Sequence, residues 1–356
     1  PFIQANDYDI NISLDPTDYK IKEVQDDTWG DTTGEWSLAY IREPAVTSGV
    51  LPDINKIVYK HSRIGGRISL IFDGKTEACT TYADAFQKIQ ADTATDPKTY
   101  IVENMSSVNM YPEDIEALAK MTNGTNKTIH FISNHEDYTN YGWTSFGHEE
   151  PNNKYHIRLR GNQLILPKDY AFIFGDCLIR CDENENENEN ELTIAANGDS
   201  VVFDKNFKVI KNKVNGQLVD TKVRIYGGSI ENNLINVTSE SKAKITINDG
   251  VFSSVYGGGN KSESGIVSKV LNFLAGNNNQ TGAEITINGG VIDNIFGGGE
   301  ETMTGDVSIN INGGEITSQI VYGGGNGAKV NGNIDVNVKD ASAVNLKSIY
   351  GGGKNA

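Results

Sequence analysis

The chain has 356 residues, 37% of them hydrophobic, and carries a formal net charge of −16 at pH 7. A chain this acidic is not expected to bind nucleic acid, because phosphate recognition needs clustered lysine and arginine. Binding to anionic membrane surfaces is disfavoured for the same reason, and the sequence shows no apolar run long enough for a transmembrane helix. We therefore expect no nucleic-acid partner and no membrane insertion.

The three cysteines, Cys79, Cys177 and Cys181, are too few, and odd in number, for a disulfide framework. Cys177 and Cys181 could not bridge if both lie on one extended strand, where four residues span about 13 Å. Buried thiols are the expected state, and no cofactor is expected.

Residues 1–66 lack the repeats found later in the chain. Short β-like runs alternate there with turns rich in Asp, Thr and Gly, which predicts an N-terminal β module or cap. The start at Pro1 is typical of a mature or trimmed product. Acidic β-repeats rich in Asn and Gly are typical of exported bacterial proteins, so we expect an extracellular or cell-surface location.

Two strands and two amphipathic helices are predicted between residues 67 and 124. The strands are expected at 67–72 and 99–103. Thr81 and Asp84 have the spacing of a capping box, and the helix that follows places Tyr82, Phe86 and Ile89 on one face. A second helix is expected from Pro112, because proline suits a first helical turn. The first helix should cover the open end of a repeat array.

Further strands are predicted at 128–132, 155–160, 192–195 and 223–226, as successive units of one repeat with longer loops. The insert at 182–191 alternates Glu and Asn, so it should stay in solvent. The insert at 265–275 has apolar residues at helical spacing and is expected to lie flat on the array.

One stretch, 134–160, could hold a ligand, because histidines, aromatic rings and carboxylates gather there. Lys154, His156, Arg158 and Arg160 alternate along the last strand, giving a basic stripe that suits an anionic sugar. The other interpretation is that this stretch is a loop held in place by packing of its own aromatic rings. The basic side chains of the stripe would then form ion pairs with nearby carboxylates. No metal is expected, because His135 and His148 match no ligand spacing. The candidate ligand-binding residues are His135, Glu136, Tyr141, Trp143, His148, His156 and Arg158, and none is assigned a catalytic role.

From residue 222 onward one short motif recurs, most clearly as AEITINGGVIDNIFGGG at 283–299. Period-2 alternation of Ile and Val predicts two strands per repeat, and Gly289-Gly290 predicts a bend with φ > 0 between them. Glycines 297–299 are expected to form a second corner of the same kind. Other copies begin at 223, 243, 307 and 334, and such periodicity predicts a solenoid of stacked repeats.

Equivalent residues of stacked repeats should lie above one another. Tyr256, Phe296, Tyr322 and Tyr350 all precede a triple glycine and should form one aromatic column. Asn248, Asn288 and Asn312 precede the glycine-containing bend and should form an amide ladder, with Tyr226 and Lys339 replacing asparagine in the first and last copies. The loops after each triple glycine, at 260–282, 300–305 and 326–332, are a second possible location for ligand binding.

The final copy, 334–353, would leave a strand edge uncovered. We expect that the chain is either cut short of further repeats or associates end to end with another copy.

These elements, a helical plug followed by strands such as TIHFISN and then xITINGG…VYGGG repeats, resemble the pectin-lyase-like superfamily, above all its repeat-bearing surface proteins of gut and soil bacteria. The resemblance covers about residues 67–356. It implies a mainly β chain folded as a right-handed parallel β-helix, with a helical cap and, at 1–66, the N-terminal β module. The superfamily includes polysaccharide lyases, glycoside hydrolases and adhesins.

The clean repeats lack the carboxylate clusters that its lyases and hydrolases use. We therefore expect a non-enzymatic, adhesin-like module that binds carbohydrate, such as a polysaccharide or a host-surface glycan, or another cell-surface partner. The alternatives are a polysaccharide lyase or glycoside hydrolase with its site in 130–160, and a purely structural stalk.

Overall fold

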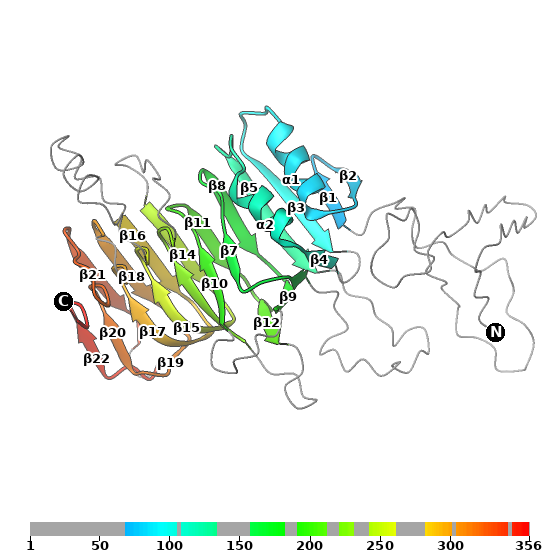
Figure 1. Cartoon of the computed structure of the whole chain (residues 1–356). Helices are drawn as coiled ribbons and strands as arrows, with labels where there is room; N and C mark the ends of the chain where they lie inside the picture. Colours follow the sequence, from blue (N-terminus) through cyan, green and yellow to red (C-terminus); the bar gives the residue numbers. More distant parts are fainter. Residues whose placement is uncertain are drawn as a thin grey trace, which may run out of the picture.

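The computed structural model describes residues 68–104, 108–133, 157–181, 191–211, 221–230, 242–260, 282–300, 304–340 and 344–355. This part of the chain is mainly β, with long sheets of mostly parallel strands and two helices (Figure 1). The predicted module at 1–66 and the predicted helix at 265–275 lie outside the described residues, as does the acidic insert except for Glu191.

The largest sheet has ten strands in the order β2-β1-β3-β5-β8-β11-β14-β16-β18-β21. β1 pairs antiparallel with β2 and β3, and every later pair is parallel. Its strands are β1 (Ile68–Phe72), β2 (Lys75–Cys79), β3 (Lys98–Asn104), β5 (Lys127–Ser133), β8 (Tyr170–Phe174), β11 (Ser200–Phe203), β14 (Lys242–Ile247), β16 (Gly282–Ile287), β18 (Val307–Ile311) and β21 (Ile334–Val338).

A second sheet has eight parallel strands, ordered β22-β20-β17-β15-β13-β10-β7 with β19 also paired to β17. They are β7 (Gln163–Ile165), β10 (Glu191–Ala195), β13 (Lys222–Tyr226), β15 (Val251–Tyr256), β17 (Val291–Phe296), β19 (Glu315–Ile316), β20 (Ile320–Tyr322) and β22 (Ser348–Tyr350). A third, four-stranded parallel sheet runs β12-β9-β6-β4, from β4 (Val108–Met110), β6 (Ile157–Leu159), β9 (Leu178–Cys181) and β12 (Lys208–Lys211).

The chain visits these sheets in a fixed rotation. From β5 to β13 it passes from the ten-stranded to the four-stranded to the eight-stranded sheet, three times in succession. From β14 onward the four-stranded sheet is skipped, and each repeat supplies one strand to the ten-stranded sheet and then one or two to the eight-stranded sheet. The described repeats therefore change from three sheets to two near residue 242.

This rotation corrects the predicted series at 128–132, 155–160, 192–195 and 223–226. The strands exist, but they lie in different sheets: β5 in the ten-stranded, β6 in the four-stranded, and β10 and β13 in the eight-stranded one. The series was wrong because the earlier repeats hold three strands each, and similar sequence spacings joined strands that do not pair. Only β10 and β13 are hydrogen-bonded neighbours.

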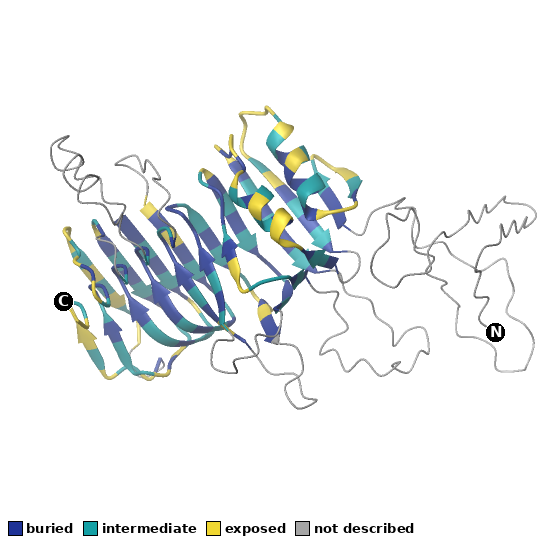
Figure 2. Cartoon of the chain, viewed as in Figure 1, coloured by how far each residue is buried: buried dark blue, intermediate teal, exposed yellow. Residues whose placement is uncertain are grey.

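Alternation of side chains builds the core. In β5 every second residue is buried, and Phe131 packs against Phe174 of β8, with ring centroids 5.5 Å apart. Phe174 in turn stacks on Phe203 of β11 at 5.4 Å, and Phe203 meets Phe252 of β15 at 5.0 Å. These rings give one continuous interior, coloured dark blue in Figure 2.

The two predicted helices are confirmed as α1 (Tyr82–Ala91) and α2 (Pro112–Ala119). Thr81 Oγ1 accepts a hydrogen bond from the Asp84 amide at 3.1 Å, which starts α1 as its sequence predicts. The Asp114 carboxylate accepts from the Ala83 amide at 2.9 Å and so ties the two helices together. α2 contacts β7, the outermost strand of the eight-stranded sheet, so this helix covers that end.

The predicted aromatic column is confirmed and is one ring longer than expected. Tyr256, Phe296, Tyr322 and Tyr350 stack with centroids 4.9, 5.3 and 5.4 Å apart. Tyr226, assigned from the sequence to the asparagine position, instead stacks on Tyr256 at 4.8 Å, and the two are register partners of β13 and β15. Tyr226, Tyr256 and Phe296, with Tyr322 packed against them, belong to a cluster separate from the main core.

The amide ladder is also confirmed. Asn288 donates to Asn248 at 2.8 Å, and Asn312 donates to Asn288 at 2.9 Å. The position assigned to Tyr226 was wrong, because Asn248 itself donates at 3.2 Å to Asp204, which ends the ladder.

Glycine is required at the two corners of the repeat for different physical reasons. Gly290 has φ +80°, as the bend predicted. The triple glycine does not adopt positive φ at Gly297 or Gly298, so that expectation was wrong. A Cβ at Gly297 would instead lie 2.2 Å from the Gly323 carbonyl oxygen, and one at Gly298 would lie 2.8 Å from the Gly325 nitrogen. Glycine is needed there because the backbone of the next repeat packs directly against it.

Candidate functional site

Six of the seven predicted ligand-binding residues lie outside the described residues. These are His135, Glu136, Tyr141, Trp143, His148 and His156. Arg158 is described and lies in the middle of β6, between the buried side chains of Ile157 and Leu159. The alternation expected for this strand is therefore present, with Arg158 on the face opposite the core.

Arg158 has a second arginine beside it. In the four-stranded sheet, Arg158 of β6 is the register partner of Arg180 of β9. Both side chains are half-buried, and parallel neighbours in a sheet lie about 4.8 Å apart. The register of β6 and β9 therefore places two positive charges next to each other on the outer face of the sheet.

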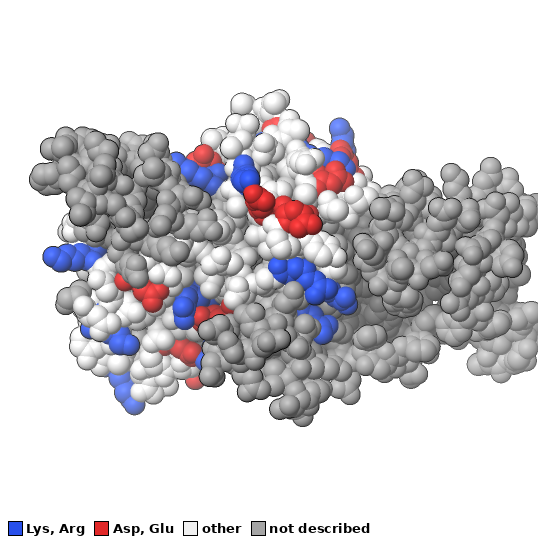
Figure 3. All heavy atoms as spheres, viewed as in Figure 1, with Lys and Arg blue, Asp and Glu red and all other residues white. Residues whose placement is uncertain are grey.

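A third arginine extends this surface toward β4. Arg160 Nε donates to Asn109 Oδ1 at 3.0 Å, and Asn109 is the register partner of Arg158 on its other side. The Arg160 amide also donates to the Met110 carbonyl at 2.9 Å, which fixes the chain at the end of β6. We call Arg158, Arg160 and Arg180 the arginine row. Figure 3 shows lysine and arginine atoms gathered over β4 and β9, next to the acidic surface of α2.

Arg180 was not recognised from the sequence. It lies in a short apolar strand, LIRC, without any repeated motif, and only strand pairing places it beside Arg158. The one available signal was that Arg180 is the single charged residue of this strand, between the buried Ile179 and Cys181.

His130 belongs to another surface. It lies on β5, in the ten-stranded sheet, so it is not on the sheet that carries Arg158. Its buried Nε2 atom has no hydrogen-bond partner, and burial lowers the pKa of the imidazole. A Cβ at Gly175 would lie 2.3 Å from that Nε2 atom, so the ring is packed against backbone.

A second charged cluster, unexpected from the sequence, lies on the eight-stranded sheet. Arg224 of β13 pairs with Glu191 of β10 at 2.7 Å, and Lys222 pairs with Asp293 of β17 at 2.5 Å. Asp293 also accepts from Thr317 Oγ1 at 2.6 Å. These contacts link β10, β13 and β17 across two or three repeats.

The carboxylates of this cluster are already engaged within the chain. Glu300 accepts a hydrogen bond from the Tyr226 hydroxyl, and burial together with Glu300 raises the pKa of that tyrosine. Burial raises the pKa of Glu191, and Arg224 opposes the change. Because each carboxylate has an internal donor, the cluster serves to join repeats and is not the candidate site.

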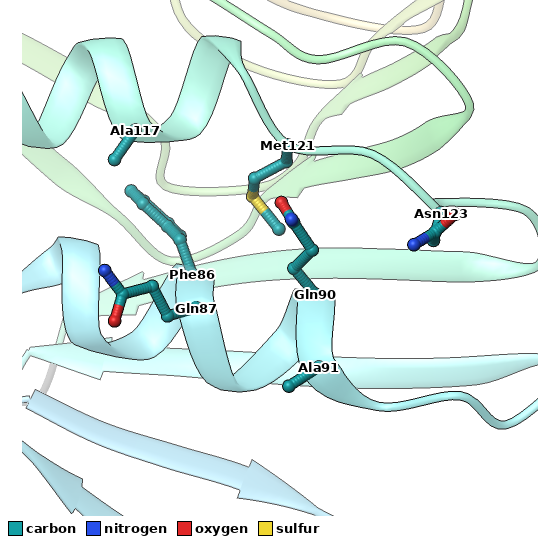
Figure 4. Close-up of a pocket in the computed structure, with 7 residues that line it drawn as sticks. All are labelled: Phe86, Gln87, Gln90, Ala91, Ala117, Met121 and Asn123. Carbon is teal, nitrogen blue, oxygen red and sulfur yellow. The ribbon is translucent and has the colours of Figure 1, made fainter.

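A cleft of about 220 Å³ lies between α1 and α2 (Figure 4). Phe86 and Met121 line it with apolar surface, and the Gln90 side-chain oxygen accepts from the Thr122 amide at 3.2 Å. Ligand pockets are usually about 300–1,000 Å³ with several convergent polar groups. The cleft is smaller than this, and the arginine row remains the better candidate.

Within the described residues no group of three or more His, Cys, Asp or Glu side chains is placed to hold a metal ion. Neither described helix has the length and apolar character needed to cross a bilayer. Comparisons with protein-family models, with curated proteins and with solved structures find no match to this chain.

Proposed function

We propose that the three sheets are faces of one right-handed parallel β-helix of the pectin-lyase-like kind, and that this scaffold binds an anionic polysaccharide. The fixed rotation of the chain through the sheets supports the solenoid, because parallel neighbours then come from successive repeats. The exported, cell-surface setting inferred from composition supports a polysaccharide or surface glycan as the ligand. The proposal assigns the protein no reaction.

The observation that carries this function is the register of Arg158 with Arg180. Guanidinium groups are planar and hold carboxylates through two parallel hydrogen bonds. Two of them one strand apart suit a polymer with closely spaced carboxylates, such as a chain of uronic acids. The exposed parts of Arg160 and Asn109 extend the same surface along the strands.

The rigid backbone around the row supports binding without rearrangement. Ile157, Leu159 and Ile179 are buried directly beneath the arginines, and β6 is paired on both sides. A backbone held in this way loses little entropy when a ligand arrives.

The test is retention on polygalacturonate by affinity electrophoresis, with neutral dextran as the reference polymer. The wild-type chain is expected to be retained on polygalacturonate alone, with retention falling as salt rises. Arg158→Ala with Arg180→Ala should weaken binding at least about 100-fold, since each charge-assisted contact is worth roughly 1.5–3 kcal/mol.

The charge-matched control is Lys339→Ala with Lys347→Ala. These two exposed lysines directly follow β21 and precede β22, and both are away from the four-stranded sheet. It removes the same formal charge and should leave retention unchanged. Wild-type retention by the folded arginine variant would contradict the proposal. Release of shortened sugars from polygalacturonate by the wild type would support a lyase or hydrolase instead.

A further inference from the structure

We propose that a sugar ring of the bound polymer packs against Tyr111, and that this residue makes the arginine row specific for polysaccharides over other polyanions. The inference rests on the anion-binding function proposed above, and it names the class of polymer that the same surface accepts. Tyr111 is the residue between Met110, which ends β4, and Pro112, which begins α2 (Figure 1).

Tyr111 is connected to the arginine row through a single amide group. The Tyr111 hydroxyl accepts a hydrogen bond from Asn109 Nδ2 at 3.0 Å, and Oδ1 of the same side chain accepts from Arg160 Nε at 3.0 Å. Asn109 is also the register partner of Arg158 in the four-stranded sheet. One asparagine side chain therefore holds the tyrosine ring next to the guanidinium groups, on the β4 side of the row.

The ring of Tyr111 is accessible to a ligand. Its residue is 40% exposed, and the only other exposed large hydrophobic residues in the described parts of the chain, Ile349 and Tyr350, lie on β22 of the eight-stranded sheet. A single exposed tyrosine needs no explanation by itself. Here the exposed ring adjoins cationic groups, and a uronic acid can use both, because it carries a carboxylate beside a ring with an apolar C–H face.

The backbone at Tyr111 is fixed by hydrogen bonds that do not involve the ring. Its amide donates to Asp114 Oδ2 at 3.0 Å, and its carbonyl oxygen accepts from the amides of Asp114 and Ile115, both at 3.0 Å. A tyrosine has only two main side-chain torsions to immobilise, so on a fixed backbone it offers contact area at a low entropy cost. Removing the ring would leave these backbone contacts in place.

The arginines alone would not distinguish a polyuronate from another polymer with closely spaced carboxylates. Guanidinium groups hold the carboxylates of an acidic polypeptide in the same way. An aromatic face adds attraction only for a ligand that has ring surface next to its charge. Because the phenol ring is uncharged, this part of the affinity should not be screened by salt. Tyr111 therefore supplies the discrimination, and the arginine row supplies the attraction of charge.

The experiment is affinity electrophoresis of the full chain in polygalacturonate and, in parallel, in poly-L-glutamate of similar length. We expect the wild type to bind polygalacturonate more tightly. Tyr111→Ala should weaken binding to polygalacturonate about five- to tenfold, by the same factor at low and high salt, and should leave binding to poly-L-glutamate unchanged. Tyr111→Phe keeps the ring and should keep most of the affinity. Arg158→Ala with Arg180→Ala should weaken binding to both polymers.

The matched control is Tyr350→Ala, which removes a tyrosine that is 50% exposed on a different sheet and should bind both polymers like the wild type. Circular dichroism verifies that each variant is folded. If the arginine variant loses both polymers but Tyr111→Ala loses neither, or loses both equally, the role of Tyr111 is overturned and the anion-binding function stands. If the wild type binds neither polymer, or the arginine variant binds polygalacturonate like the wild type, the anion-binding function fails and this inference fails with it.

Discussion

Gly297 lies so close to Gly323 that a Cβ on the former would be 2.2 Å from the carbonyl oxygen of the latter. The two residues occupy the same position in consecutive repeats of the eight-stranded sheet. The separation of the repeats at this corner is therefore set by the absence of a side chain. Any side chain here would have to push two backbones apart.

Gly297→Ala is therefore expected to destabilise the fold by about 1–3 kcal/mol, the usual cost of overpacking, or more if the backbone cannot move. Gly351→Ala makes the same chemical change where nothing lies within 4 Å, and should alter stability by no more than about 0.5 kcal/mol. Urea unfolding followed by circular dichroism measures both. Equal stability of the two variants would show that the corner can relax.

Phe296→Ala tests the aromatic column. The ring is 2% exposed and stacks between Tyr256 and Tyr322, so its loss should cost about 3–5 kcal/mol. Tyr350→Ala removes a ring that is 50% exposed and has one stacking neighbour, and should cost clearly less. Thermal melts of the two variants give the comparison, and a larger loss for Tyr350 would show that the column is not held by burial.

Asn288→Ala interrupts the amide ladder. The side chain both donates to Asn248 and accepts from Asn312, and it is exposed, so the two contacts together are worth about 1 kcal/mol. Asn288→Asp keeps the acceptor and removes the donor, which should leave an intermediate stability at neutral pH. If the alanine variant melts at the wild-type temperature, the ladder follows the fold without stabilising it.

Asp199 should give the fold a measurable pH dependence. Burial raises the pKa of its carboxyl from 3.8 to about 6, although the carboxylate accepts from the Asp169 amide at 2.7 Å. A raised pKa means that the protonated form favours folding, so this contribution is fully present below pH 3.8 and is lost as pH rises through about 6.

Asp199→Asn should accordingly match the wild type in acid and become the more stable protein above about pH 6. Denaturant unfolding at several pH values measures the difference, with Asp335→Asn, an exposed site, as the control for net charge. A stability difference that does not change with pH would contradict the assignment of this shift to Asp199.

The regular repeats could be predicted because their residues align by sequence. Phe296 and Tyr322 precede identical glycine triplets, so the sequence predicts that their rings stack without knowledge of the strand register. Tyr226 was misplaced because its copy, VRIYGG, has two glycines in place of three, and the register between β13 and β15 shifts after Val223. Because one glycine is missing, this copy was aligned at the asparagine position and not at the triple-glycine position.

The candidate site was less accessible to sequence reasoning. Arg158 was found because it alternates within its own strand. Arg180 was missed because its place beside Arg158 depends on which strands pair, and no motif marks the three-sheet repeats. The sequence also could not show why three glycines are needed. The close approach of Gly297 and Gly323 depends on how two repeats pack, and the sequence of a single repeat does not reveal it.

The register shared by the two-sheet repeats has a consequence for the length of the protein. Ile245, Ile285 and Ile309 face one another in consecutive strands, as do Ile247, Ile287 and Ile311. If the repeat that begins at β16 were removed, β14 would meet β18 with isoleucine opposite isoleucine at both positions. Deleting this repeat would therefore preserve the isoleucine contacts of the ten-stranded sheet, although it would remove Asp293 and with it the ion pair to Lys222.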